Sequence, residues 1–95
     1  MSSILKVINE TTFKQDWSVQ GSSLANEKKL GAKKGDLFSV INIDYFDDNN
    51  EKNPATSEEK KDYWYVQFEK PLHGQESWYV YRPHVEHWAF GKKLK

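Results

Sequence analysis

Glycine and proline interrupt this chain so often that few of the segments between them are long enough for a typical helix. The interruptions fall at Gly21, Gly31, Gly35, Pro54, Pro71, Gly74, Pro83 and Gly91. The segments between them are rich in β-branched and aromatic residues, which favour strands. No internal repeat is visible at the periods typical of repeat proteins. The pattern therefore predicts an all-β fold of five or six short strands, arranged as a small barrel or sandwich.

The length of 95 residues is that of one domain with one modest core. We expect residues 1–88 to form this domain and residues 89–95, which end in Lys92-Lys93-Leu94-Lys95, to form a basic C-terminal tail. Within the domain, residues 47–61 contain no hydrophobic side chain other than Ala55. We expect this segment to form one long, mobile acidic loop.

The charge balance and the absence of cysteine exclude several classes of function. Fourteen basic residues balance 14 acidic ones, which argues against a dedicated binder of nucleic acid or of a membrane surface. The chain has no cysteine, so disulfides, thiolate zinc sites and cysteine nucleophiles are excluded. No apolar run is long enough for a signal peptide or a membrane helix. We therefore expect a cytoplasmic protein, or an extracellular one if this chain is a domain of a secreted protein.

Two aromatic segments, residues 62–69 and 78–82, read as the strands of a hairpin. Because side chains alternate between the faces of a strand, Trp64, Val66 and Phe68 should face the core. The same rule, applied with Trp78 and Val80 inward, predicts four tyrosines on one outer face: Tyr63, Tyr65, Tyr79 and Tyr81.

Such a tyrosine cluster has two interpretations. Cross-strand tyrosine pairs stabilise a half-exposed sheet, each by about 0.2–1 kcal/mol. Flat aromatic surfaces also stack on sugars, polyproline segments or bases. The residues themselves leave both interpretations open.

Metal binding and catalysis find little support in the motifs. In a strand, His84 and His87 point to opposite faces, so their spacing does not chelate zinc. We expect His84 to hydrogen-bond a turn and His87 to lie at the surface. The acidic segment follows the spacing of a calcium loop, but Lys52 occupies the position of its required glycine. There is no nucleophile elbow and no glycine-rich phosphate loop, so we predict no cofactor, no metal and no enzymatic activity.

The C-terminal half of the chain resembles a known type of module. The residues concerned are Trp64-Tyr65-Val66-Gln67-Phe68, a loop with Gly74, and Ser77-Trp78-Tyr79-Val80-Tyr81-Arg82-Pro83-His84-Val85-Glu86. They are similar to a small bacterial SH3-like module found beside cyanobacterial cell-wall hydrolase or chitinase-type domains. The N-terminal half is similar in outline, through Thr11-Thr12-Phe13-Lys14 and Lys34-Gly35, so that the resemblance covers about residues 3–88.

This resemblance implies an SH3-like barrel that serves as a non-catalytic targeting or protein-binding piece. The positions that match the motif are Trp78, Tyr79, His84 and Glu86. Together with Trp64, Trp78 would anchor the core, and His84 would fix a strand end.

We therefore expect a binding module whose outer aromatic face takes a peptide or a cell-wall glycan. The alternative is a cytoplasmic protein-interaction subunit or regulator that homodimerises through the same face. A less favoured alternative is a single-stranded nucleic-acid binder that uses the lysines at positions 6, 14, 28, 29, 33 and 34.

Overall fold

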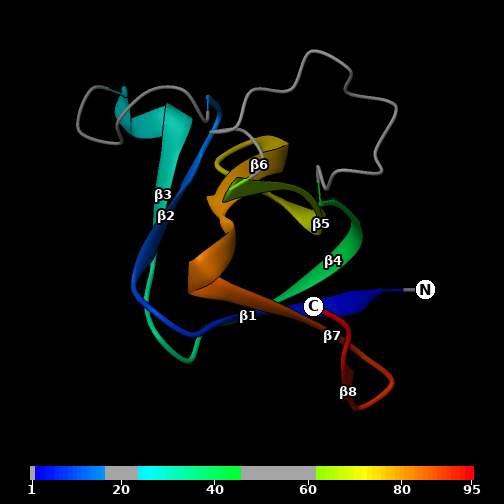
Figure 1. Ribbon diagram of the computed structural model, residues 1–95. Coiled ribbons are helices and arrows are strands. Elements are labelled where there is room, and N and C mark those ends of the chain that lie inside the picture. Colours follow the sequence, from blue (N-terminus) through cyan, green and yellow to red (C-terminus); the bar gives the residue numbers. More distant parts are fainter. Residues whose placement is uncertain (1, 17–23, 46–61) are drawn as a thin grey trace.

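The computed structural model describes residues 2–16, 24–45 and 62–95, and in these ranges the protein is all-β (Figure 1). Eight strands of the described ranges form one antiparallel sheet in the order β3-β2-β6-β5-β4-β1-β7-β8. Their bounds are β1 Ser3–Val7, β2 Thr11–Lys14, β3 Lys29–Ala32, β4 Leu37–Asp44, β5 Tyr63–Leu72, β6 Gln75–Tyr81, β7 Val85–Ala89 and β8 Lys92–Lys93. Two short 3-10 turns, η2 (Asn26–Lys28) and η4 (Arg82–His84), precede β3 and β7.

The sheet contains eight strands, whereas the sequence predicts five or six. β3 is a strand that the sequence analysis does not predict, and it pairs with β2 from Thr11↔Ala32 to Lys14↔Lys29. β8 lies in the segment expected to be a basic tail, and it pairs with β7 through Ala89↔Lys92. The predicted acidic loop, residues 47–61, lies outside the described residues.

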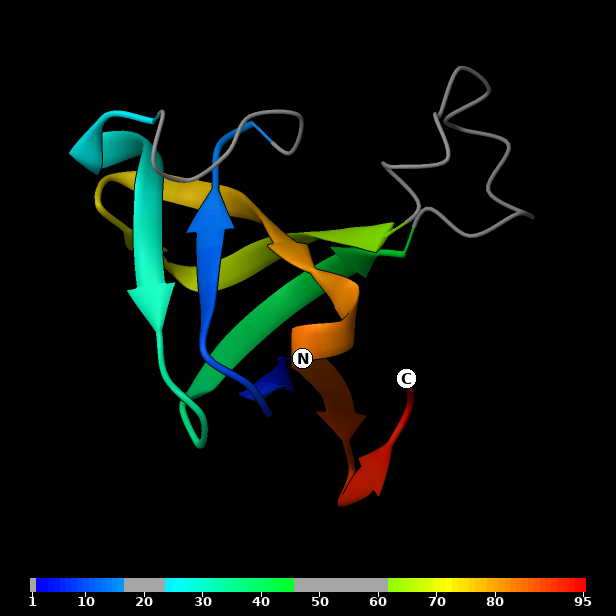
Figure 2. The same cartoon turned by 60° about the vertical axis from the view of Figure 1, so that its left-hand side comes forward.

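The sheet curls until its two halves face each other (Figure 2). Phe13 of β2 meets Phe38 of β4 and Phe68 of β5 edge to face, each with ring centroids 5.3 Å apart. In the sheet order β2 and β4 are separated by β6 and β5, so a flat sheet could not bring Phe13 and Phe38 into contact. The curl stops short of closure, because β3 and β8 remain as the two edges of the described sheet.

One hydrophobic cluster fills the inside of the curl. Its largest members, Trp78 and Phe13, are fully buried, and Trp64 and Phe68 are each 2% exposed. The cluster as a whole comprises Leu5, Val7, Phe13, Ala32, Val40, Trp64, Val66, Phe68, Trp78, Val80 and Val85. The residues predicted to face inward from β5 and β6 therefore do so.

Two hairpin turns have the same two-residue geometry. His73-Gly74 joins β5 to β6, and Phe90-Gly91 joins β7 to β8. Both central residues of each turn have positive φ: 51° and 75° in the first, 54° and 74° in the second. This is the type I′ pattern, whose twist matches that of the flanking strands.

Among the described residues, no helix is long and apolar enough to cross a membrane.

Candidate functional site

The four tyrosines predicted to share an outer face are brought together by the register of β5 and β6. Tyr63 lies opposite Tyr81, and Tyr65 lies opposite Tyr79. The ring centroids are 5.6 Å apart in the first pair and 4.5 Å apart in the second. We call these four residues the tyrosine face.

The rings of the tyrosine face are partly open to solvent. Tyr65 is 38% exposed and Tyr81 is 36% exposed, whereas Tyr63 and Tyr79 are half-buried. The face therefore offers flat apolar area together with phenol hydroxyl groups, a combination common in binding surfaces.

Charged residues continue the tyrosine face across the sheet. Lys14 of β2 is the register partner of Tyr79, and Lys29 of β3 is the partner of Lys14. On the other side, Asp44 of β4 is the partner of Tyr65. One row across five strands thus runs from two lysines, over two tyrosines, to an aspartate.

The electrostatic environment keeps the phenol of Tyr79 protonated. Burial raises the pKa of Tyr79, and the nearby Tyr65, Asp16 and Asp44 raise it further. The ionised form is disfavoured both by desolvation and by neighbouring negative charge. Tyr79 therefore keeps a neutral hydroxyl, able to donate a hydrogen bond, through neutral and mildly alkaline pH.

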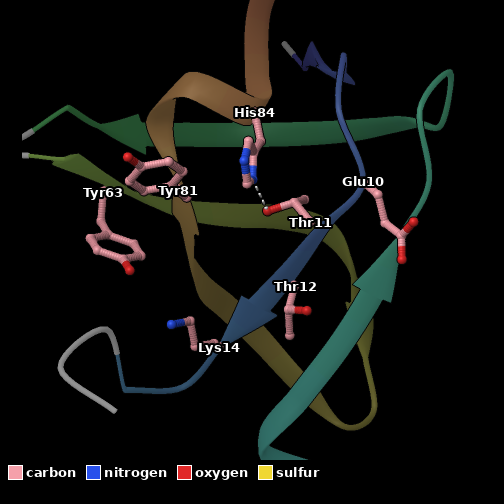
Figure 3. A pocket seen from close by; sticks show the side chains of 7 residues that line it. All are labelled: Glu10, Thr11, Thr12, Lys14, Tyr63, Tyr81 and His84. Atoms are coloured by element: carbon pink, nitrogen blue, oxygen red, sulfur yellow. Dashed lines mark hydrogen bonds between the residues drawn. The ribbon is translucent and has the colours of Figure 1, made fainter. Parts of the chain in front are cut away.

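A cavity of about 450 Å³ opens beside Tyr63 and Tyr81 (Figure 3). Its other walls come from the end of the β1–β2 connection, from β2 and from η4. Figure 3 shows the two tyrosine rings on one side and Glu10 on the other, with Thr11 and His84 between them. The complete lining is Glu10, Thr11, Thr12, Lys14, Tyr63, Tyr81 and His84. The Lys14 ammonium lies 5.3 Å from the centre of the Tyr63 ring, a cation–π distance.

His84 joins two walls of this cavity. Its Nδ1 shares a hydrogen bond of 2.9 Å with Oγ1 of Thr11, and its ring meets the Tyr81 ring edge to face at 4.8 Å. Pro83 sits in the first turn of η4, so the chain turns at this point and presents His84 toward β2. The side chain expected to bond a turn thus bonds a neighbouring strand, and it ties η4 to β2.

The hydrogen bond between Thr11 and His84 can be tested by an isosteric substitution. We expect Thr11→Val to lower the free energy of unfolding by about 1 kcal/mol, because it leaves a half-buried imidazole nitrogen unpaired. Thr11 is only 7% exposed, so its methyl group would stay in place while the hydroxyl is lost. Equilibrium unfolding in urea measures the change. Thr11→Ser keeps the hydroxyl and should retain the bond. Equal loss in the serine and valine variants would show that packing of the methyl group, not the hydrogen bond, matters.

The other predicted site residues lie away from the cavity lining. Trp64 and Trp78 are in the core, where Nε1 of Trp78 donates to the carbonyl of Gln75 at 3.2 Å. Glu86 lies on β7, accepts a hydrogen bond of 3.0 Å from Nε1 of Trp88 and pairs with Lys93 at 3.4 Å. The bond from Trp88, followed by the interaction with Lys93, holds the pKa of Glu86 below its usual value. Of the four motif positions, only His84 and Tyr79 belong to the site and its tyrosine face.

The expectation that His87 lies at the surface is wrong. His87 is 9% exposed, and both of its ring nitrogens have hydroxyl partners. Nε2 lies 2.6 Å from Oγ of Ser3, and Nδ1 is hydrogen-bonded to the hydroxyl of Tyr45. Both partners are far away in the sequence, on β1 and just after β4, so local spacing gave no sign of them. Burial lowers the pKa of His87.

No group of three or more His, Asp or Glu side chains in the described ranges is arranged to hold a metal ion. The segment with calcium-loop spacing falls in residues 47–61, outside those ranges.

Comparisons with protein-family models, with curated proteins and with solved structures gave no match to this chain.

Proposed function

We propose that this protein is a non-catalytic binding module that holds an extended chain, a peptide or a cell-wall glycan, against its tyrosine face. The observation that carries the proposal is that the tyrosine face continues into the cavity, because Tyr63 and Tyr81 belong both to the face and to the cavity wall. A ligand lying across the rings of Tyr65 and Tyr79 can therefore place its next unit in the cavity.

The chemistry of the lining suits a ligand with flat apolar faces and polar edges. Tyrosine rings stack on sugar rings and on proline-rich segments, and a tyrosine has few torsions to restrict on binding. Around the rings, the cavity adds hydroxyl groups from Thr11 and Thr12 and one charge of each sign, from Lys14 and Glu10. These polar groups would fix the orientation of the ligand and make binding specific, because stacking on the rings alone discriminates poorly between ligands.

The row of charges gives the proposed peptide an orientation. Lys14 and Lys29 lie at one end of the row and Asp44 at the other. A peptide with its acidic end over β2 and β3 and its basic end over β4 would match this polarity. The reversed charge pattern should bind more weakly, and the difference should shrink at high salt.

We also propose that the fold is an SH3-like barrel, as the resemblance of residues 3–88 implies. The curl that brings Phe13 against Phe38 supports this proposal, as does the small all-β sheet.

Replacing Tyr65 and Tyr79 together by alanine should weaken binding at least about tenfold, because a stacked ring contributes about 1–3 kcal/mol. The probes are chitin oligomers, peptidoglycan fragments and proline-rich peptides, titrated by calorimetry at low and high salt. Tyr65→Phe with Tyr79→Phe is the matched control, because it keeps the rings and removes only the hydroxyls. Full binding by the alanine pair, with its fold intact, would contradict the proposal.

The exposed fractions of Tyr65 and Tyr81 also favour a second candidate, homodimerisation through the same face. Sedimentation equilibrium of the chain without ligand separates the two. A dimer at low and high salt that the alanine pair abolishes would make the tyrosine face an interface between copies. A monomer that binds single-stranded nucleic acid only at low salt would instead indicate phosphate recognition.

A further inference from the structure

The turn between β7 and β8 carries an aromatic side chain in an unfavourable place. Phe90 is 82% exposed, the most exposed of the large hydrophobic residues in the described ranges. Its φ of 54° lies in the left-handed region, which a bulky residue rarely adopts. The position is therefore unfavourable twice, once for the backbone and once for the hydration of the ring.

The requirements of the turn do not explain this phenylalanine. The other type I′ turn of the sheet has His73 at the equivalent position, and histidine is among the residues enriched at positive φ. Asparagine followed by glycine is the pair that such turns favour most. Folding alone would thus be served better by asparagine at position 90, and strained residues of this kind concentrate at functional places.

Basic residues lie close to Phe90 in the sequence. Lys92 and Lys93 form β8 after Gly91, and the neighbouring Leu94 is 50% exposed. On the next strand, the Trp88 ring is half-buried, and the Lys6 ammonium lies 5.8 Å from its centre. The hairpin from Val85 to Lys95 carries three lysines against one acidic side chain, Glu86, which forms a partly exposed ion pair of 3.4 Å with Lys93 and leaves the hairpin with an excess of positive charge. Figures 1 and 2 both show the β7–β8 hairpin projecting at one end of the molecule.

We propose that this hairpin is a membrane-binding tip, in which Phe90 enters the interface of an anionic bilayer while Lys92 and Lys93 bind lipid headgroups. Charge complementarity identifies the occupant, because the apolar point is flanked by cations that anionic headgroups attract. Lysine stems can also lie along the apolar region while their charged ends reach the headgroups. The protruding shape of the hairpin suits a bilayer, because insertion into a bilayer requires no cleft of matching shape.

This site is separate from the proposed tyrosine face. β8 is an edge strand of the sheet, whereas β5 and β6 lie three or more strands away in the sheet order. A membrane surface was disfavoured by the neutral net charge of the whole chain. The sequence shows why that average misleads, because the acidic residues between positions 44 and 62 offset the lysines in the rest of the chain.

Vesicle co-sedimentation of the full chain tests the proposal with two probes, phosphatidylcholine vesicles with and without phosphatidylserine. We expect binding only to the vesicles with phosphatidylserine, and weaker binding at high salt. Phe90→Asn should weaken it about tenfold, the loss expected when a partly buried phenyl ring is removed. Lys92→Gln with Lys93→Gln should weaken it by a similar factor.

Two controls separate binding from folding and from bulk charge. Phe90→Asn creates the favoured turn sequence, so its unfolding temperature should stay equal or rise by a few degrees while vesicle binding falls. Lys28→Gln with Lys70→Gln removes the same charge from exposed positions on η2 and β5, and it should leave binding unchanged.

Three results would each overturn the proposal: no binding to phosphatidylserine vesicles, unchanged binding by Phe90→Asn, or equal loss in both lysine pairs. Self-association of the chain that Phe90→Asn abolishes, without vesicle binding, would make a second copy the partner of the tip instead.

Discussion

Replacing Phe13 by alanine is expected to lower the free energy of unfolding by about 3–5 kcal/mol, the range measured when buried phenylalanines are truncated. Phe13 is fully buried, and its ring meets Phe38 and Phe68 edge to face. A small domain is stable by only about 5–15 kcal/mol, so this loss would leave it near its unfolding threshold at room temperature. The effect should be large because Phe13 joins the two halves of the curled sheet.

Urea denaturation measures the loss, and two variants control it. Phe90→Ala makes the same chemical change at an exposed position and should shift the free energy of unfolding little, if at all. Phe13→Leu keeps most of the volume and should cost less than Phe13→Ala. If Phe13→Ala were no more harmful than Phe90→Ala, the two halves of the sheet would not be packed through this ring.

Mild acid is expected to destabilise the fold through His87. Burial lowers the pKa of His87 below the ordinary value of 6.5, so the folded state resists protonation. The unfolded chain binds that proton first, and the free energy of unfolding therefore falls as pH drops below about 6.5. The fall ends once pH passes the lowered pKa of the folded state. Its slope is at most about 1.4 kcal/mol per pH unit for this one proton.

Thermal and urea unfolding between pH 7.5 and 5 would show this dependence, and His87→Gln is the matched control. Glutamine cannot take up the proton, and it retains groups that can bond the hydroxyls of Ser3 and Tyr45. The pH slope in this range should be smaller in the glutamine variant than in the wild type. An unchanged slope would show that the acid sensitivity does not come from His87.

The hairpin of β5 and β6 is the part of the fold that the sequence specifies most fully. Its alternation is so regular that the inward positions of Trp64 and Trp78 and the shared face of Tyr65 and Tyr79 follow from the two-residue period alone. The turn at His73-Gly74 does not set the register of the tyrosine pairs by itself, because the pairing of β5 and β6 shifts between Gln67 and Leu72. The all-β class was predicted correctly for the same reason, since local composition decides it.

What the sequence could not show depends on contacts between distant segments. β3 contains Lys29 and Gly31 among its four residues, so it has little strand propensity of its own and forms because it pairs with β2. β8 is likewise a strand only beside β7. His87 looked like a surface residue because Tyr45 and Ser3, which satisfy its ring, lie 42 and 84 positions away.

The cavity was hidden for a similar reason. Its walls combine residues 10–12 and Lys14 with Tyr63, Tyr81 and His84, and only the curl of the sheet brings β2 over η4. Tyrosine alternation predicted half of the site. The polar half, which includes Lys14 and Thr11, follows no recognisable sequence motif, and only the topology of the sheet brings its residues to the cavity.

The position of β1 sets the order in which this protein can finish folding. β1 begins at Ser3, yet it lies between β4 and β7, with Ile4 paired to both Ser39 and Trp88. The pairing of Ile4 with Trp88 closes a loop that contains most of the chain. The conformational entropy of that loop is lost before the pairing contributes any stabilisation, which slows folding. We infer that β1 remains half-paired, with one edge open, until β7 arrives. Slow folding should therefore be intrinsic to this topology, even where the finished sheet is stable.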